Sequence, residues 1–247
     1  MDNLKEIIMV TEPEVVKSYK WEKDAQFLHP AVQVLSMEDI ERLQEKHTDL
    51  FGGKSVYPES VWMKHPFMHN QYIDINTAED VLTKSKLNAL GLIARHLGVK
   101  SFTTTFVTTQ TEERKHDVNG DVKYKMIEAK TTVNLKKEDS SSNQYYRKEE
   151  YSGNFSEESY QEAIKLAKEY GLYNDEDIFY LIQQRNPQHL NMIKNQHVKV
   201  ELARELNESL DVAFSLDACK VFKLNANYQQ TISIKKTVTL ETDLVFE

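Results

Sequence analysis

Residues 222–246 read FKLNANYQQTISIKKTVTLETDLVF, a stretch in which apolar and polar side chains alternate. Ten of its thirteen even positions are apolar, whereas only two of the fourteen odd positions from 221 to 247 are apolar. Because successive side chains of a β-strand point to opposite faces, a period of two predicts antiparallel strands with one apolar and one polar face. The alternation begins near Val198, so antiparallel strands are expected over residues 196–246.

A second amphipathic strand region lies upstream, over residues 101–137. The Thr-rich stretch from Ser101 to Glu113 is followed by Asn119-Gly120. This dipeptide favours a tight hairpin turn because both residues tolerate positive φ. A return strand is expected from Val122 onward, which completes a hairpin over residues 101–137.

Helical patterns precede each of the two strand regions. Residues 77–97 carry apolar side chains three and four positions apart, which predicts an amphipathic helix, and Gly98 follows where a left-handed cap ends a helix. Residues 157–185 predict two further helices, the first of which Ser156 is suited to cap.

These elements together predict the fold class. Since amphipathic helices need an apolar surface to cover, we expect an α+β fold, a long antiparallel β-sheet built from two amphipathic hairpin regions with helices packed on one face. Four of the five prolines lie in the first 75 residues. Residues 1–75 are therefore expected to form an irregular N-terminal segment with one short helix, and residues 76–247 the α+β domain.

Composition excludes several classes of function. The formal net charge is −8, which disfavours nucleic acid as a partner because phosphates are bound mainly by Lys and Arg. The chain has one cysteine, Cys219, so no intramolecular disulfide can form, and no apolar run reaches the ~20 residues that span a bilayer. We therefore expect a cytoplasmic protein. Seven glycines without a phosphate-loop motif disfavour nucleotide-binding enzymes.

Two local patterns are candidate sites. His65 and His69 have the i, i+4 spacing of a helical metal site, but Pro66 between them disfavours the helix that this spacing needs. Cys219 falls on a polar, odd position, yet no base that would activate its thiol is marked in the sequence. We therefore assign no catalytic, cofactor-binding or metal-ligating residue and expect no cofactor.

The sequence then favours a non-catalytic binding or assembly protein, acting through protein–protein contacts or self-association. Long strands with exposed edges are suited to that role because their backbone groups can pair with another chain. Two alternatives stay open. One is a soluble precursor of a membrane-inserting, β-pore-forming effector. The other is a small-ligand binding protein or enzyme with a pocket between helices and sheet, in which Glu128 or Asp217 would supply an acid.

Overall fold

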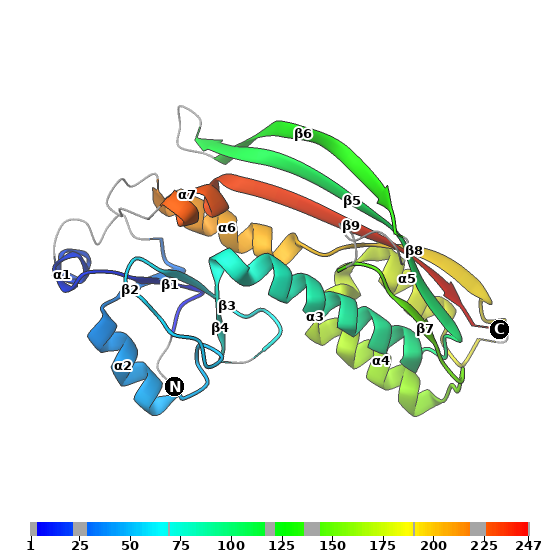
Figure 1. Ribbon diagram of the computed structural model, residues 1–247. Helices are drawn as coiled ribbons and strands as arrows, with labels where there is room; N and C mark the ends of the chain where they lie inside the picture. The colour runs from blue at the N-terminus through cyan, green and yellow to red at the C-terminus, as the bar shows by residue number, and fades with distance from the viewer. Residues whose placement is uncertain are drawn as a thin grey trace. The chain divides into compact units, whose positions relative to one another are not determined.

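The computed structural model describes residues 4–21, 29–68, 70–116, 122–135, 144–189, 191–217 and 226–246 (Figure 1). Over these residues the fold is α+β, as the sequence predicts, with a long antiparallel sheet and helices packed against it. The chain forms two compact units. Unit 1 comprises residues 1–79, 111–127 and 205–235, and unit 2 comprises residues 80–110, 128–204 and 236–247. The division into an N-terminal segment, residues 1–75, and an α+β domain, residues 76–247, stays a prediction.

Unit 1 contains a four-stranded sheet with the strand order β2-β1-β3-β4. Its strands are β1 (Ile7–Val10), β2 (Val32–Leu35), β3 (Val61–Lys64) and β4 (Tyr72–Asp74). Strand β1 pairs in parallel with β2 and antiparallel with β3. Helices α1 (Pro13–Trp21) and α2 (Met37–Lys46) follow β1 and β2 in the chain.

The expectation of an irregular segment with one short helix over residues 1–75 was therefore wrong. Each strand of this sheet has only three or four residues, and all four residues of β1 are buried. Strands that are short and buried on both faces show no alternation, so no periodic signal marks them. Of the two helices described in these residues, α2 is capped by Ser36 and Asp39 through reciprocal hydrogen bonds.

Unit 2 is built from helices and most of the larger sheet. Its helices include most of α3 (Ile75–His96), together with α4 (Glu157–Glu169) and α5 (Glu176–Gln184). Gly98 ends α3 with a φ of +80°, as predicted. Ala94, Ala163 and Ile178 from these helices are buried in one core with Phe102 and Val238 from the strands.

The larger sheet has the strand order β6-β5-β9-β8, and a short strand β7 also pairs with β5. Its strands are β5 (Ser101–His116), β6 (Val122–Asn134), β7 (Lys148–Glu150), β8 (Asn195–Glu201) and β9 (Ile234–Val245). The predicted strands of the 101–137 hairpin thus form. The expected turn at residues 118–121 lies outside the described residues.

The C-terminal strands form only in part. Strands β8 and β9 pair antiparallel from Asn195↔Val245 to Glu201↔Thr239, but residues Arg204–Asp217 and Ala226–Ser233 are helices, α6 and α7. The assignment of strands to these two segments was wrong. Within α6 the buried residues Leu206, Leu210 and Phe214 are four apart. Residues four apart share one face of a helix, and they also share one face of a strand. The spacing of these apolar residues therefore fits either structure.

Candidate interaction surface

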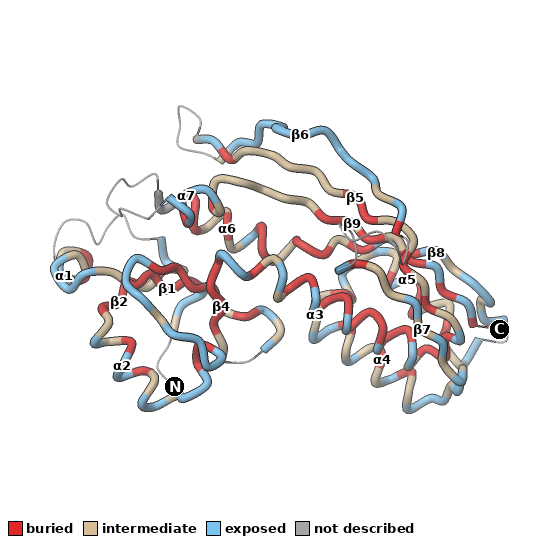
Figure 2. The backbone as a smooth tube through the Cα atoms, viewed as in Figure 1, coloured by how far each residue is buried: buried red, intermediate tan, exposed pale blue. Residues whose placement is uncertain are grey.

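Strand β6 is an edge strand whose residues are exposed on both faces. Among the described strands it pairs only with β5, and every residue from Lys123 to Thr132 is exposed (Figure 2). Three of these are large and apolar, with exposed fractions of 41% for Tyr124, 57% for Met126 and 54% for Ile127. An edge strand presents a row of backbone N–H and C=O groups that a further strand can pair with.

The length of β6 and its lack of proline are unusual for a protected edge. Natural edges are usually short, are interrupted by proline or a bulge, or carry charged side chains, especially Lys. Strand β6 has 13 residues and no proline. It carries three lysines and one glutamate, so it is locally positive in a chain of net charge −8. It therefore combines a long pairing edge with exposed apolar side chains and a few charges.

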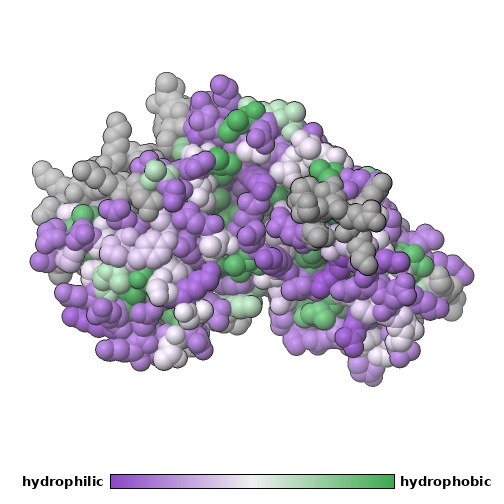
Figure 3. All heavy atoms as spheres, viewed as in Figure 1, coloured by the Kyte–Doolittle hydropathy of each residue, from purple (hydrophilic) through white to green (hydrophobic). Residues whose placement is uncertain are grey.

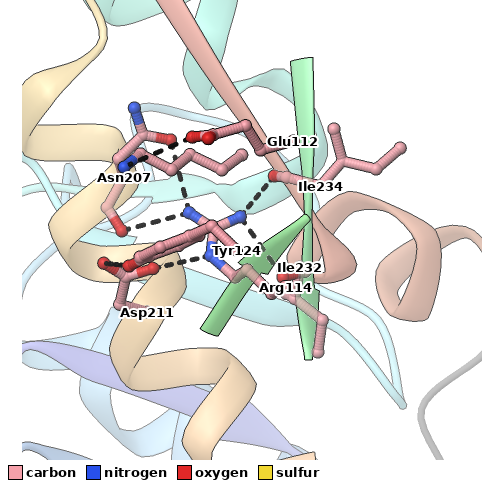
Figure 4. Close-up of polar contacts among 8 residues, drawn as sticks. Glu112, Arg114, Tyr124, Asn207, Asp211, Ile232 and Ile234 are labelled. Carbon is pink, nitrogen blue, oxygen red and sulfur yellow. Dashed lines mark hydrogen bonds and ion pairs between the residues drawn. The ribbon is translucent and has the colours of Figure 1, made fainter. Parts of the chain in front are cut away.

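A buried arginine fastens the neighbouring strand β5 to other elements of unit 1 (Figure 4). Arg114 is only 2% exposed. Its Nε donates to Asp211 Oδ1 at 2.6 Å, and its Nη2 donates to the backbone and side-chain oxygens of Asn207, each at 3.3 Å. Its Nη1 donates to the backbone carbonyls of Ile232 and Ile234. One guanidinium thus joins β5 to α6, to the end of α7 and to the start of β9.

Tyr124 extends this cluster onto β6. Its hydroxyl donates to Asp211 Oδ2 at 2.9 Å, and the Lys235 ammonium lies 4.0 Å from the centre of its ring. Lys235 also pairs with Glu112 at 3.7 Å. Burial, and then the hydrogen bond to Asp211, raise the pKa of the Tyr124 hydroxyl. The Tyr124 hydroxyl therefore keeps its proton at neutral pH, and its hydrogen bond to Asp211 joins β6 to α6.

A second polar cluster in unit 1 joins Tyr57, Asp74 and Tyr228. The Tyr228 hydroxyl lies 3.1 Å from each carboxylate oxygen of Asp74, and the Tyr57 hydroxyl donates to Asp74 Oδ2 at 2.9 Å. Burial raises the pKa of Tyr228, as do the Tyr57 hydrogen bond and the Asp74 charge. Neither this cluster nor Arg114 could be identified from the sequence, because the interacting residues are far apart in the chain. Arg114 and Asp211 are separated by 97 residues, and Asp74 and Tyr228 by 154.

Of the candidate residues taken from the sequence, the structure describes His65, Glu128 and the backbone of Asp217. His65 is buried, and its Nδ1 accepts from the backbone N–H groups of Phe67 and Met68 at 3.1 and 3.2 Å. Burial lowers its pKa. His69 and Cys219 lie outside the described residues. Glu128 is exposed on β6, and Asp217 is the last residue of α6.

Each unit has a pocket that is lined largely by polar residues. One, of about 330 Å³ in unit 1, includes Glu6, Lys64 and Glu208, and one of about 440 Å³ in unit 2 includes Arg95 and Glu150. On the face drawn in Figure 3, hydrophilic residues predominate and hydrophobic ones form small separate patches. Within the described ranges no group of three or more His, Cys, Asp or Glu side chains is placed to hold a metal ion. No described helix has the length and apolar character needed to cross a membrane.

Comparisons with known proteins add no assignment. The chain matches no protein-family model, no curated protein and no solved structure. The geometry of its surface is therefore the basis for a functional proposal.

Proposed function

We propose that this chain is a non-catalytic assembly protein that binds a protein partner, or itself, by adding a strand to the edge of β6. The observation that carries the proposal is the continuous exposure of β6 from Lys123 to Thr132 along an edge that only β5 pairs with among the described strands. In strand addition, main-chain hydrogen bonds supply affinity and alternate side chains supply specificity. We also propose a cytoplasmic location, on the single cysteine of the sequence.

The anchoring of the hairpin supports this mode of binding. The Arg114 cluster fixes β5 and Tyr124 of β6 to α6, so the backbone next to it is held in place before a partner arrives. A pre-ordered edge loses less conformational entropy when a strand docks on it.

The charges of β6 disfavour the pore-forming alternative. Lys123 and Lys125 occupy odd positions, whereas Glu128 and Lys130 occupy even positions. Because successive side chains of a strand point to opposite faces, both faces of β6 carry charge. A strand that meets lipid needs one apolar face, and a Lys there costs about 2–4 kcal/mol at the bilayer midplane.

Site-specific photocrosslinking in cells that produce the protein tests the proposal. A photoreactive amino acid replaces Met126 on β6 or, as a control of similar exposure, Tyr180 on α5, which is 54% exposed. We expect a discrete crosslinked product from position 126 only. The variant Lys130→Pro, which removes one backbone donor from the edge, should reduce that product at least about five-fold, since proline cannot donate to a sheet.

Two outcomes would contradict strand addition to β6. One is a set of products that is the same from positions 126 and 180. The other is a product from position 126 that Lys130→Pro leaves unchanged while circular dichroism shows the variant to be folded.

A further inference from the structure

The hydrogen bonding at the C-terminal end of β6 shows which of its backbone groups face outward. The Leu135 N–H donates to the Thr105 carbonyl at 2.7 Å, so residue 135 is in a hydrogen-bonded pair with β5. The hydroxyls of Thr108 and Thr132 lie 2.9 Å apart. Thr108 is three residues after Thr105, and Thr132 is three residues before Leu135, so these two pairs belong to the same antiparallel register. Thr132 is therefore in a non-hydrogen-bonded pair, and its own N–H and C=O point away from β5.

The alternation extends this orientation along the strand. Every second residue of a β-strand directs its backbone groups to the same side, so Lys130 and Glu128 also present theirs to the outer edge. Their side chains share one face of β6, and Ala129 lies between them. All three residues are exposed.

This pattern is complementary to itself. When two copies of β6 pair antiparallel with Ala129 opposite Ala129, Glu128 of each copy faces Lys130 of the other, which makes two opposite-charge pairs. An axis at Glu128 or Lys130 instead puts like charges opposite each other, and an axis at residue 127 or 131 makes no charge pair. Directly opposed charges contribute roughly 0.2–1 kcal/mol a pair, favourable or unfavourable according to sign.

Ala129 suits the position on the axis. In this register residue 129 is in a non-hydrogen-bonded pair, where opposed Cα atoms approach to about 4.5 Å. A small side chain is accommodated there without crowding. The overlap runs from Tyr124 to Asn134 in both copies and places Met126, which is 57% exposed, opposite Thr132.

We propose that the partner of β6 is a second copy of this chain, docked antiparallel about a two-fold axis at Ala129, so that the two five-stranded sheets become one. The inference rests on the proposed function of β6 as a docking edge. The reciprocal pairing of Glu128 with Lys130 favours a second copy over an unrelated strand, because a two-fold contact requires one surface to match itself.

A cysteine at the axis gives the sharpest test. In a Cys219→Ser background, Ala129→Cys should form a disulfide-linked dimer under mild oxidation, because its two copies would face each other in the closest type of pair. Ile127→Cys and Thr131→Cys are matched controls on the same strand and should stay at least about ten-fold less crosslinked. In the proposed register, each control cysteine lies four positions from the same cysteine in the second copy, about 13 Å along the strand.

Exchanging the charges tests the register independently by light scattering during size exclusion. Glu128→Lys and Lys130→Glu should each raise the dimer dissociation constant about ten- to thirty-fold, because each turns two attractive pairs into two repulsive ones. The double variant restores both pairs in reverse and should return to within about three-fold of the unmodified chain.

The outcomes separate this inference from the proposed function. A monomeric chain without a dimer from Ala129→Cys, or equal crosslinking at 127, 129 and 131, overturns the two-fold docking. If position 126 then photocrosslinks to a different protein, the function of β6 stands. If position 126 also yields no discrete product, both proposals fail.

Discussion

Replacing Arg114 with methionine should strongly destabilise unit 1. The substitution keeps a long apolar side chain but removes a buried cation whose donors serve Asp211, Asn207 and two backbone carbonyls. Removing one partner of a buried ion pair costs about 3–5 kcal/mol, because the groups left behind stay buried without a donor. The Asp211 side chain is 33% exposed and regains some hydration, which favours the lower half of that range.

Urea unfolding followed by tryptophan fluorescence suits this measurement. Both tryptophans, Trp21 and Trp62, belong to unit 1, so the signal reports on the unit that contains Arg114. With a slope of about 2 kcal/mol per M, a loss of about 3–4 kcal/mol lowers the midpoint by about 1.5–2 M. Arg114→Lys should recover little of the loss, because one ammonium cannot supply the forked donors of a guanidinium.

An exposed ion pair of the same unit is the matched control. Lys64 pairs with Glu6 at 3.4 Å, and their side chains are 41% and 64% exposed. Lys64→Met should change the free energy of unfolding by less than about 0.5 kcal/mol. If Arg114→Met stays within about 1 kcal/mol of the unmodified chain, the Arg114 cluster is not the anchor of β5.

Two further predictions concern His65 and Gly98. Since burial holds the pKa of His65 below 6.5, the stabilising neutral ring is fully present above that pH and its contribution is lost as the pH falls. His65→Gln should therefore flatten the fall in unfolding free energy between pH 7 and pH 5, by at most about 1.4 kcal/mol per pH unit, and an unchanged slope in thermal or urea unfolding would contradict this. Gly98 has a φ of +80°, and an added Cβ would lie 2.9 Å from the Phe155 Cβ. Gly98→Ala should cost at least about 2 kcal/mol, more than Gly52→Ala, where φ is +58° but nothing lies within 4 Å, and equal losses measured by circular dichroism would show that crowding is unimportant.

The sequence predicted those elements in which the spacing of the apolar residues fits either a helix or a strand, but not both. The helix over residues 77–97 and the helices within 157–185 correspond to α3, α4 and α5. Over β9, Val238, Leu240 and Leu244 are buried as the alternation requires. Strand and helix predictions succeeded where only one period fits the apolar residues.

The edge of β6 could be foreseen only in outline. The sequence predicts a long amphipathic strand after Val122, but it cannot say which strand of a sheet ends at the edge, because strand order depends on pairings between distant segments. The order β6-β5-β9-β8, with β9 next to β5, places β6 outermost. The role of Arg114 depends in the same way on α6 and β9, which follow it by about a hundred residues.

The sequence by itself determined the fold class, the principal helices and the presence of long antiparallel strands, because these follow from which neighbouring side chains share a face. Tertiary structure decided between helix and strand over residues 204–217 and 226–233, where Tyr228 and Ile232 are four apart and also both even. Positions four apart share a face in either conformation, so packing against the rest of the unit had to select one. It also decided that β6 lies at an edge, which is the property on which the proposed function depends.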